Sequence, residues 1–458
     1  MGFEGIHTFY FLGIGGIGMS ALARYFASNG CCVLGYDRTA SDLTRELERE
    51  GIFVQYDDSL DAVQKLDKAT TVVVRTPAVP EDTEVYVWLR EKGFKILKRA
   101  EVLGMVTRSA RALCVAGTHG KTTTSTMLAH ILHRSHIGAN AFLGGIANNY
   151  GTNLLLDESQ NVVVEADEFD RSFHHLTPHI SVITSMDPDH LDIYGTEDAY
   201  RESFWKYASL VEHSLIVKQG ISLPYQGLTA RLYTYSVNEQ ADFYADDVRV
   251  KNGEIHFDFH TPESVVRDVC LGVPAWVNVE NSVAAMAVAW LMGATDDELR
   301  DGVSSFKGVH RRFNVHLNTQ QVAYLDDYAP HPQELKASIE SVRRLYGDRY
   351  VIGVFQPHLF TRTRDFADDF ADVLSTLDEV VLLPIYPARE MPIEGVSSEW
   401  LLEKISTKKS LVQKPQLALH LRDIVSGKVA KGIDCVVVTM GAGDIDRLVN
   451  DITKTLIL

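Results

Sequence analysis

The stretch VAGTHGKTTTSTMLAH, residues 115–130, governs the interpretation of the whole sequence. An apolar run over 113–116 precedes it and predicts a short buried strand, and apolar residues at helical spacing over 123–132 predict a helix. Gly117 and Gly120 allow the turn between these elements to approach a ligand with bare backbone. The amides at the start of a helix attract an anion. The stretch therefore predicts an anion-binding loop between a strand and a helix.

The two residues after Gly120 specify the anion. Lys121 can reach β- or γ-phosphate oxygens, and Thr122 offers a hydroxyl of the kind that ligates Mg²⁺ in phosphate-binding loops. The usual pattern has four residues between its glycines, whereas this one has two, so we interpret it as a variant phosphate loop. The alternative is an ordinary strand-to-helix turn with a solvated lysine. The order of strand, glycines, Lys-Thr and helix favours a nucleoside triphosphate site.

Composition limits the classes of protein that the chain can belong to. A length of 458 residues suggests about three domains of roughly 150 residues each. The formal net charge of −17 disfavours nucleic acid or an anionic membrane as a general partner. Five cysteines without a C-x-x-C pair indicate neither a disulfide framework nor a zinc site. With no signal-peptide pattern and no apolar run of about 18 residues, we expect a soluble cytoplasmic enzyme.

The first hundred residues contain a second glycine turn. Gly13, Gly15 and Gly18 fit G-x-G-x-x-G after a predicted strand, and Asp37 ends the next one, which is the dinucleotide fingerprint. By itself this pattern indicates NAD. The same turn also serves other pyrophosphates and flavodoxin-like half-domains. Alternating strands and helices around it predict an α/β domain.

Acidic residues follow two predicted strands after the phosphate loop. Within 161–173, a predicted strand of valines is followed by Glu165 and further acids. Within 180–195, a second predicted strand is followed by Asp187 and His190. Ligands bind beyond the carboxyl ends of strands in open α/β sheets, so these acids could hold Mg²⁺ opposite the phosphate loop. The alternatives are a solvated acidic loop and a capping or core histidine.

The last third of the chain again alternates strands with helices, which predicts a parallel sheet. One strand ends in Asp326 and Asp327, and another ends near His358, with Arg362 and Arg364 just beyond. Basic strand ends suit a carboxylate or a phosphate, although a solvated arginine pair is an equal alternative.

Taken together, these motifs resemble those of the Mur ligases. The matching motifs, in chain order over about residues 7–447, are GIGGIGMS, GTHGKTTT, EADE, DPDHLD, NxxN, HRRF, DDYAPHP, FQPH and GAGD. The resemblance implies an α/β protein of three domains: a Rossmann-like domain for the UDP substrate (1–108), a central ATP-binding domain of the P-loop type with a parallel-rich sheet (109–307), and a Rossmann-like domain for the amino acid (308–458).

The resemblance also implies an activity. An ATP-dependent ligase would phosphorylate the carboxylate of UDP-N-acetylmuramate, and the amine of L-alanine would attack the acyl phosphate, in peptidoglycan precursor synthesis. ATP would be the co-substrate and Mg²⁺ the metal. The glycine turn would then receive the uridine nucleotide rather than NAD. We expect a monomer or weak homodimer.

The family's functional positions map onto this sequence as follows. Catalytic roles fall to Lys121, Glu165, His190 and Arg362, and metal ligation to Thr122, Glu165 and His190. Contacts to ATP fall to Gly117, Thr118, His119, Gly120, Lys121, Thr122, Thr123, Asn278, Asn281, Asp327 and one of Arg311 and Arg312, of which we choose Arg312. Contacts to the UDP substrate fall to Gly15, Gly18, Asp37, Thr76, Pro77 and Ala78, and contacts to the amino acid to Tyr328, His331, His358 and Arg362.

The sequence departs from the family pattern at three places and leaves rival functions open. Val277 replaces a histidine, the run Ala329–Pro330 replaces Gly-His, and Leu359 replaces a basic residue. A ligase that recycles a preformed tripeptide would share the ATP site, and a folate polyglutamyl ligase would share the phosphate loop but not the first glycine turn. A different class of alternative is a non-catalytic nucleotide sensor. An NAD-dependent dehydrogenase would leave the phosphate loop and the acidic strand ends unexplained.

Overall fold

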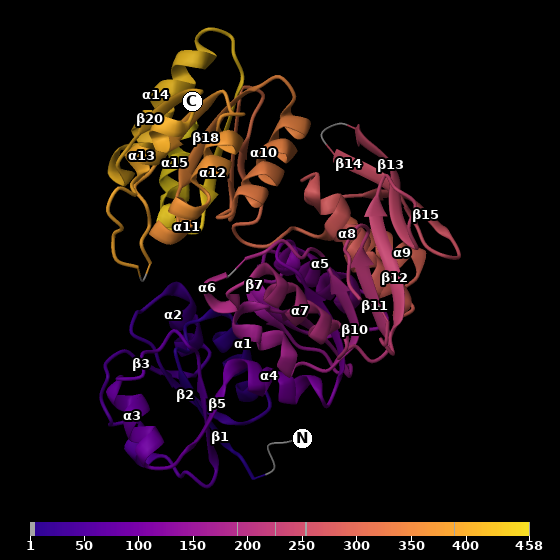
Figure 1. Ribbon diagram of the computed structural model, residues 1–458, viewed down its shortest axis with the longest axis vertical. Helices are drawn as coiled ribbons and strands as arrows, with labels where there is room; N and C mark the ends of the chain where they lie inside the picture. Colours follow the sequence, from indigo (N-terminus) through magenta and orange to yellow (C-terminus); the bar gives the residue numbers. More distant parts are fainter. Residues whose placement is uncertain (1–4, 190, 225, 252–253, 389, 458) are drawn as a thin grey trace. The chain divides into compact units, whose positions relative to one another are not determined.

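The computed structural model describes residues 5–189, 191–224, 226–251, 254–388 and 390–457 (Figure 1). It divides into two compact units. The first comprises the chain up to Val248 with Phe257–Cys270 and Asn281–Lys307, and the second comprises Arg249–His256, Leu271–Glu280 and the chain from Gly308 onward.

The N-terminal sheet has the order β3-β2-β1-β4-β5 with parallel neighbours. Its strands are β1 (Thr8–Leu12), β2 (Cys32–Tyr36), β3 (Phe53–Gln55), β4 (Thr71–Arg75) and β5 (Lys95–Lys98), and its helices are α1 (Ile17–Ser28), α2 (Asp42–Arg49), α3 (Glu84–Glu91) and α4 (Arg99–Thr107), with the 3₁₀ turn η1 (Val63–Lys65). The central strands are continuous apolar runs because helices cover both faces: β1 and β4 are almost wholly buried.

The central sheet has the order β15-β14-β13-β12-β11-β10-β6-β9-β7-β8. Its strands are β6 (Arg111–Ala116), β7 (Asn140–Ala147), β8 (Thr152–Leu155), β9 (Asn161–Ala166), β10 (Pro178–Ile183), β11 (Ser214–Lys218), β12 (Arg231–Val237), β13 (Phe243–Lys251), β14 (Glu254–His260) and β15 (Val265–Cys270). Its helical segments are α5 (Lys121–Arg134), η2 (Phe169–His175), α6 (Leu191–Tyr194), α7 (Glu197–Ala208), α8 (Val277–Leu291) and α9 (Asp296–Ser305). Strand β6 pairs in parallel with both β9 and β10, so the carboxyl ends of these three strands meet at one edge.

The C-terminal sheet has the order β16-β17-β21-β18-β19-β20. Its strands are β16 (Asn314–Asn318), β17 (Val322–Asp327), β18 (Tyr350–Gln356), β19 (Glu379–Leu382), β20 (Lys408–Leu411) and β21 (Cys435–Gly441). Its helical segments are α10 (Pro332–Tyr346), α11 (Phe360–Asp365), α12 (Ala367–Leu374), α13 (Ser398–Lys404), η3 (Lys414–Gln416), α14 (Leu417–Val429), η4 (Asp444–Leu448) and α15 (Val449–Leu456). The expected parallel sheet is present apart from its edge, where β16 runs antiparallel to β17 because only a short turn joins them.

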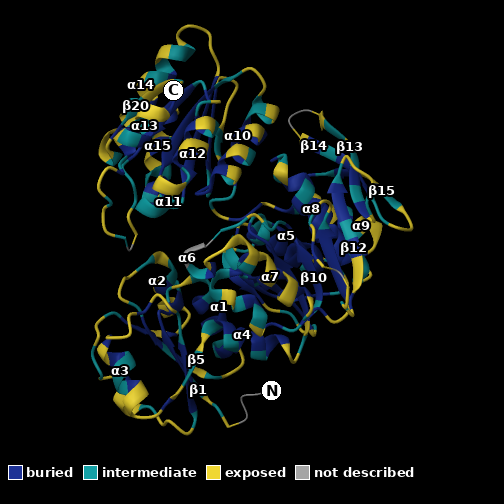
Figure 2. Cartoon of the chain, in the orientation of Figure 1, coloured by how far each residue is buried: buried dark blue, intermediate teal, exposed yellow. Residues whose placement is uncertain are grey.

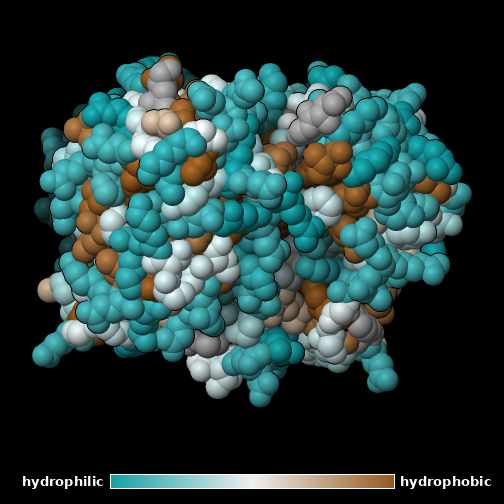
Figure 3. Space-filling view, turned by 90° about the horizontal axis from the view of Figure 1, so that it is seen from above, coloured by the Kyte–Doolittle hydropathy of each residue, from teal (hydrophilic) through white to brown (hydrophobic). Residues whose placement is uncertain are grey.

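The cores lie between the sheets and their helices. Figure 2 shows the strands largely in dark blue and the outward helix faces in yellow. In the first unit one apolar cluster is continuous across the N-terminal and central sheets: it includes Phe9 of β1 and Phe26 of α1, and Phe142 and Val164 of the central sheet. The face seen in Figure 3 is mostly hydrophilic, with hydrophobic residues in small separate patches. Among the described residues, no helix is both long enough and apolar enough to cross a bilayer.

Candidate active site

The predicted phosphate loop connects β6 to α5 at the carboxyl edge of the central sheet. Gly117 has a φ of 134° and Gly120 a φ of 80°, both in the region that side chains disfavour. A Cβ on Gly117 would lie 2.1 Å from Oγ1 of Thr184, the residue after β10. Glycine is therefore required at Gly117 for the loop to pack this closely against the neighbouring strand.

Side chains that follow β10 hold the loop in place. The amide of His119 donates to Oγ of Ser185 at 2.8 Å. The hydroxyl of Thr118 lies 2.7 Å from the carbonyl oxygen of Asp187 and 2.7 Å from the hydroxyl of Tyr200. The loop is thus tied to a second strand end and is preorganised, which reduces the entropy that ligand binding must remove.

Lys121, in the first turn of α5, is a cation whose side chain is 13% exposed. Its Nζ donates to the carbonyl oxygens of Gly117 at 2.6 Å and Thr118 at 3.2 Å, and it lies 2.7 Å from a carboxylate oxygen of Glu168. Burial lowers the pKa of Lys121, but Glu168, Asp167 and Glu165 outweigh burial and leave that pKa raised. Lys121 therefore carries its charge at the loop.

Glu168 is the buried partner of this lysine. Its side chain is 2% exposed. Burial raises its pKa to about 7, although the charge of Lys121 opposes the shift. Our assignment from the sequence omitted Glu168. The signal available was its place in the run of acids after β9, but the sequence does not show which of those acids turns inward.

Glu165, at the end of β9, lines a cavity of about 260 Å³ with Asp167, Gly16, Gly18 and Thr76. The cavity therefore joins the acidic end of the central sheet to the glycine turn of the N-terminal sheet, and both belong to the first unit. A Cβ on Gly144 of β7 would lie 2.1 Å from a carboxylate oxygen of Glu165, so the backbone of β7 closely covers this acid.

Arg99, the first residue of α4, also lines this cavity and was not among the predicted residues. Its guanidinium lies 3.2 Å from a carboxylate oxygen of Asp167. A Cβ on Gly18 would lie 2.8 Å from the same guanidinium. The cavity thus has a cationic wall beside the glycine turn and an acidic wall beside the phosphate loop.

The glycine turn and Asp37 are in direct contact. The amide of Gly15 donates to Oδ2 of Asp37 at 2.8 Å. The loop after β4 closes the other side of the turn: a Cβ on Gly13 would lie 2.4 Å from a methyl carbon of Thr76. Pro77 and Ala78 follow in the same loop and are exposed.

Asn281 and Asn278 lie in the first turns of α8. Oδ1 of Asn281 accepts a hydrogen bond from the hydroxyl of Thr124 at 3.2 Å, and a Cβ on Gly120 would lie 2.8 Å from the same oxygen. Asn281 is thus brought to the phosphate loop. Asn278, which belongs to the second unit, donates to the carbonyl oxygen of Val273 at 3.3 Å. Thr122 is buried and Thr123 is half-buried in the first turn of α5.

In the second unit, several predicted residues cluster near the start of β16 and the end of β17. Nη1 of Arg312 donates to the carbonyl oxygen of Tyr328 at 2.9 Å, and its guanidinium lies 4.7 Å from the centre of that ring. Oδ1 of Asp327 accepts from the amide of Phe313 at 3.0 Å. Burial raises the pKa of Asp327 to about 6, although Arg312 opposes the shift.

The candidate amino-acid residues lie on two loops of the second unit. His331 caps α10 by accepting from the amide of Gln333 at 3.3 Å. His358 stacks on Tyr386 with 5.8 Å between ring centres, and Arg362 is half-buried in α11. Leu359, between them, has a φ of 68°, an unusual conformation for a leucine that points to a constrained loop.

His190, the predicted second metal ligand, lies outside the described residues. The described part of the site can nevertheless be interpreted chemically. A lysine and a helix N-terminus form a phosphate cradle, carboxylates stand beside it, and a cavity leads to a second nucleotide-type turn. This arrangement suits phosphoryl transfer from a bound triphosphate to an acceptor in the cavity.

Comparison with protein families finds matches along most of the chain. Residues 8–111 match the Mur ligase family, catalytic domain; residues 115–289 match the Mur ligase middle domain; and residues 311–443 match the Mur ligase, glutamate ligase domain.

Individual relatives agree with these matches. The chain is 53% identical to a UDP-N-acetylmuramate–L-alanine ligase of Phocaeicola vulgatus, over 98% of each chain, and 54% identical to one of Parabacteroides distasonis, over 98% of this chain and 96% of the other. The crystal structure of a UDP-N-acetylmuramate–alanine ligase from Thermotoga maritima superposes with a TM-score of 0.80 at 25% identity, over 98% of each chain. From the order of its motifs, the three matched domains and this likeness over the full length, we conclude that the chain belongs to the Mur ligase family.

Proposed function

We propose that this protein is an ATP-dependent ligase that joins L-alanine to UDP-N-acetylmuramate in the cytoplasm, as a step of peptidoglycan precursor synthesis. The names of the relatives at 53% and 54% identity support this substrate pair. The observation that carries the proposal is the cavity shared by the glycine turn with Glu165 and Asp167, because the charges of these two acids also act on Lys121 of the phosphate loop.

Three parts of the chain divide the work in this proposal. Residues 1–108 hold the UDP substrate, through Gly15, Gly18, Asp37 and the loop Thr76–Ala78. Residues 109–307 hold ATP, through the phosphate loop and Asn281. Residues 308–458 supply Arg312 and Asp327 for the nucleotide.

The chemistry has two steps. A carboxylate oxygen of the sugar nucleotide attacks the γ-phosphorus, and ADP leaves with the bridging oxygen. The amine nitrogen of L-alanine then attacks the acyl carbon, and inorganic phosphate leaves as a proton is lost from nitrogen. Lys121 places a fixed positive charge where negative charge spreads during phosphoryl transfer.

Mg²⁺ suits the oxygen donors beside the phosphate loop. The hydroxyl of Thr122 and the carboxylate of Glu165 are hard oxygen ligands of the type that this ion prefers, and we assign both to it together with His190. Bound Mg²⁺ would neutralise charge on the phosphate oxygens.

The amino acid is assigned to the second unit. Arg362 would pair with the carboxylate of L-alanine through its forked guanidinium and leave the amine free to attack. Tyr328, His331 and His358 would complete this pocket.

The test is product formation by the purified protein. With ATP, Mg²⁺ and UDP-N-acetylmuramate, phosphate release should require L-alanine, and mass spectrometry should detect the sugar nucleotide with one alanine residue added. Glycine, L-serine and the tripeptide of the recycling reaction serve as alternative acceptors. Preference for the tripeptide, or no release with any acceptor, would contradict the proposal.

A further inference from the structure

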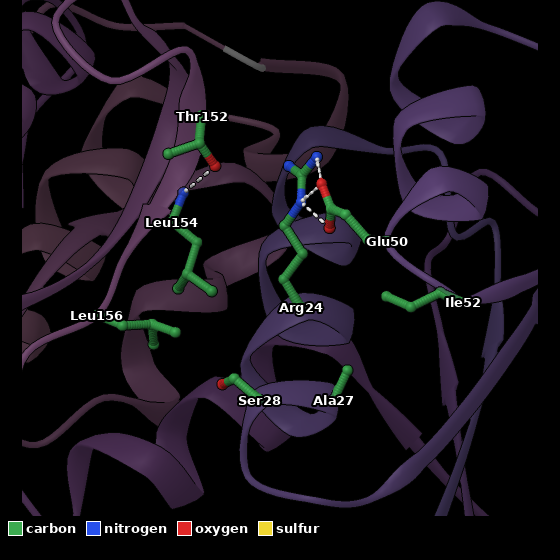
Figure 4. Close-up of a pocket in the computed structure, with 8 residues that line it drawn as sticks. All are labelled: Arg24, Ala27, Ser28, Glu50, Ile52, Thr152, Leu154 and Leu156. Atoms are coloured by element: carbon green, nitrogen blue, oxygen red, sulfur yellow. Dashed lines mark hydrogen bonds and ion pairs between the residues drawn. The ribbon is translucent and has the colours of Figure 1, made fainter.

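Arg24 carries a buried charge in α1, the helix that begins at the glycine turn. Its side chain is 8% exposed. Nε donates to the two carboxylate oxygens of Glu50 at 3.0 and 2.8 Å, and Nη2 donates to Glu50 at 2.8 Å and to Glu46 at 3.3 Å. Figure 4 shows the guanidinium turned toward Glu50, beside a cavity whose other wall includes Thr152 and Leu154. Both carboxylates come from α2 and the residue that ends it, so this part of the network lies within the N-terminal sheet and its helices.

The remaining terminal nitrogen of Arg24 bonds to the central sheet. Nη1 donates to Oδ1 of Asn153, on β8, at 2.5 Å. Asn153 is fully buried, and its Nδ2 donates back to α1, to the carbonyl oxygen of Ile17 at 2.5 Å and to Oγ of Ser20 at 2.9 Å. Both ends of the Asn153 amide are therefore bonded to α1. Buried polar groups bonded in this way fix one geometry, because any displacement leaves a donor or acceptor unsatisfied.

The central-sheet side of this link leads to the acidic strand end. Strand β8 pairs with β7, and β7 pairs with β9, with Phe142 opposite Val164. Gly144 of β7 lies against Glu165, which is near the end of β9. The ring of Phe142 packs edge-on against Tyr25 of α1 at 5.2 Å. A continuous set of contacts thus runs from the first turn of α1 to Glu165.

We propose that Arg24 and Asn153 are positioning residues, which hold the glycine turn at a fixed distance from Glu165 and the phosphate loop. The inference rests on the proposed function, in which the turn holds the sugar nucleotide and the loop holds ATP. Transfer requires reacting atoms to approach within about 3–3.5 Å, and a displacement of about 1 Å can cost on the order of 100-fold in rate.

The two roles open to this network predict different kinetics. Breaking a network that only stabilised the fold would change the melting temperature and leave the kcat of the folded protein unchanged. A positioning network instead affects the rate at which two bound substrates react. Each substrate binds mainly to its own sheet, so the affinity for each one measured alone should survive loss of the link.

Two variants break the link in different ways. Asn153→Ala removes the hydrogen bonds between α1 and β8 but leaves Arg24 paired with Glu50. Arg24→Lys keeps a positive charge near Glu50 but loses the fork that reaches Asn153. The adjoining cavity of about 430 Å³ gives water access to a lysine ammonium there, so this variant should fold. The matched control is Glu46→Gln, which removes one negative charge beside Arg24 and leaves the link to Asn153.

The measurements are kcat, the KM for ATP, the Kd for UDP-N-acetylmuramate alone, and hydrogen exchange over residues 13–28. Both link variants should lose about 10- to 100-fold in kcat, with the KM and Kd within about threefold of wild type, while Glu46→Gln stays within about twofold in kcat. Exchange over residues 13–28 should accelerate in the link variants and stay unchanged over α5.

Several results would overturn the inference. One is a kcat within about twofold of wild type in Asn153→Ala. Another is a fall in kcat/KM that is explained wholly by a higher Kd for the sugar nucleotide. If Asn153→Ala does not fold, Arg24→Lys decides by the same criteria. Wild-type protein that does not turn over UDP-N-acetylmuramate would contradict the proposed function instead. Hydrogen exchange then decides this inference: unchanged exchange over residues 13–28 in the link variants would overturn it.

Discussion

Replacing Gly117 with alanine tests how closely the phosphate loop packs against the end of β10. The new Cβ would lie 2.1 Å from Oγ1 of Thr184 and 2.8 Å from the amide nitrogen of Ser185, and the residue would keep a φ of 134°. Both the crowding and the backbone conformation oppose the substitution. The loop must therefore shift, and its carbonyl bonds to Lys121 must shift with it.

The size of the effect follows from these two costs. Strained backbone costs about 1–3 kcal/mol, and overpacking costs about 1–3 kcal/mol. Together they amount to about 2–6 kcal/mol, so a loss of at least about 30-fold in kcat/KM for ATP is expected if the loop must regain its native form to bind the triphosphate.

The assay is phosphate release at varied ATP, together with thermal unfolding. Gly220→Ala is the matched control: Gly220 also has a positive φ, of 91°, but a Cβ on it would meet no atom of the described residues within 4 Å. It should cost only about 1–3 kcal/mol of stability and leave kcat/KM for ATP unchanged. Adding Thr184→Ala to Gly117→Ala should recover activity only in part, since Ser185 still crowds the methyl group. Wild-type kcat/KM and melting temperature in Gly117→Ala would refute this reasoning.

Four further predictions concern single side chains. Lys121→Ala should lose at least ~100-fold in turnover, because it removes a charge aimed at the transferring phosphoryl group. It also leaves the buried Glu168 carboxylate without its cation, so adding Glu168→Gln should restore thermal stability but not activity. Near-normal turnover in the single variant would contradict the assignment. Glu165→Gln should raise the Mg²⁺ concentration for half-maximal activity by about tenfold or more, and an unchanged Mg²⁺ titration would remove Glu165 from the metal site. Burial, assisted by Arg134, lowers the pKa of His130 to about 4. The neutral form of His130 therefore contributes stability that is fully present above the unfolded pKa of about 6.5 and is lost as pH falls toward 4. Between pH 7.5 and 5, urea unfolding should show that wild type loses about 2 kcal/mol more of its unfolding free energy than His130→Gln does, and equal losses would argue against the shift. Arg362→Ala should impair alanine use far more than acyl phosphate formation, so isotope scrambling in ATP labelled at the β,γ-bridge should persist in this variant without amino acid. Wild-type protein that scrambles the label only when alanine is present would argue against formation of the acyl phosphate before alanine is needed.

Local patterns sufficed to predict the strand, loop and helix around Lys121. Apolar runs and glycines act over a few residues, and the structure has β6 and α5 with bounds close to those expected. The same holds for the glycine turn between β1 and α1. The family resemblance was also confirmed, because motif order over the whole chain is far more specific than one motif.

Long-range partners could not be predicted in this way. The sequence shows several acids after β9, and the structure shows that Glu168, the residue before η2, is the one that contacts Lys121. Arg24 meets Asn153 across 129 positions of sequence. Neither pairing leaves a periodic signal. The assignments of individual residues to ATP, the sugar nucleotide, the amino acid and the metal stay predictions.

The hydrogen bonds of Asp37 bear on how dinucleotide sites are recognised and redesigned. Its Oδ2 accepts from the amide of Gly15 at 2.8 Å and its Oδ1 from the amide of Thr39 at 3.1 Å. In the dinucleotide fingerprint, an acid at this spacing accepts from a ribose hydroxyl. Here Oδ2 fastens the glycine turn and Oδ1 fastens the loop after β2, so this carboxylate has a structural role in addition to any contact with a ligand. A search by spacing cannot distinguish an acid that binds a ribose from one that fastens the backbone. Replacing Asp37 to change the cofactor preference of this turn would first require another group to accept the hydrogen bonds from Gly15 and Thr39.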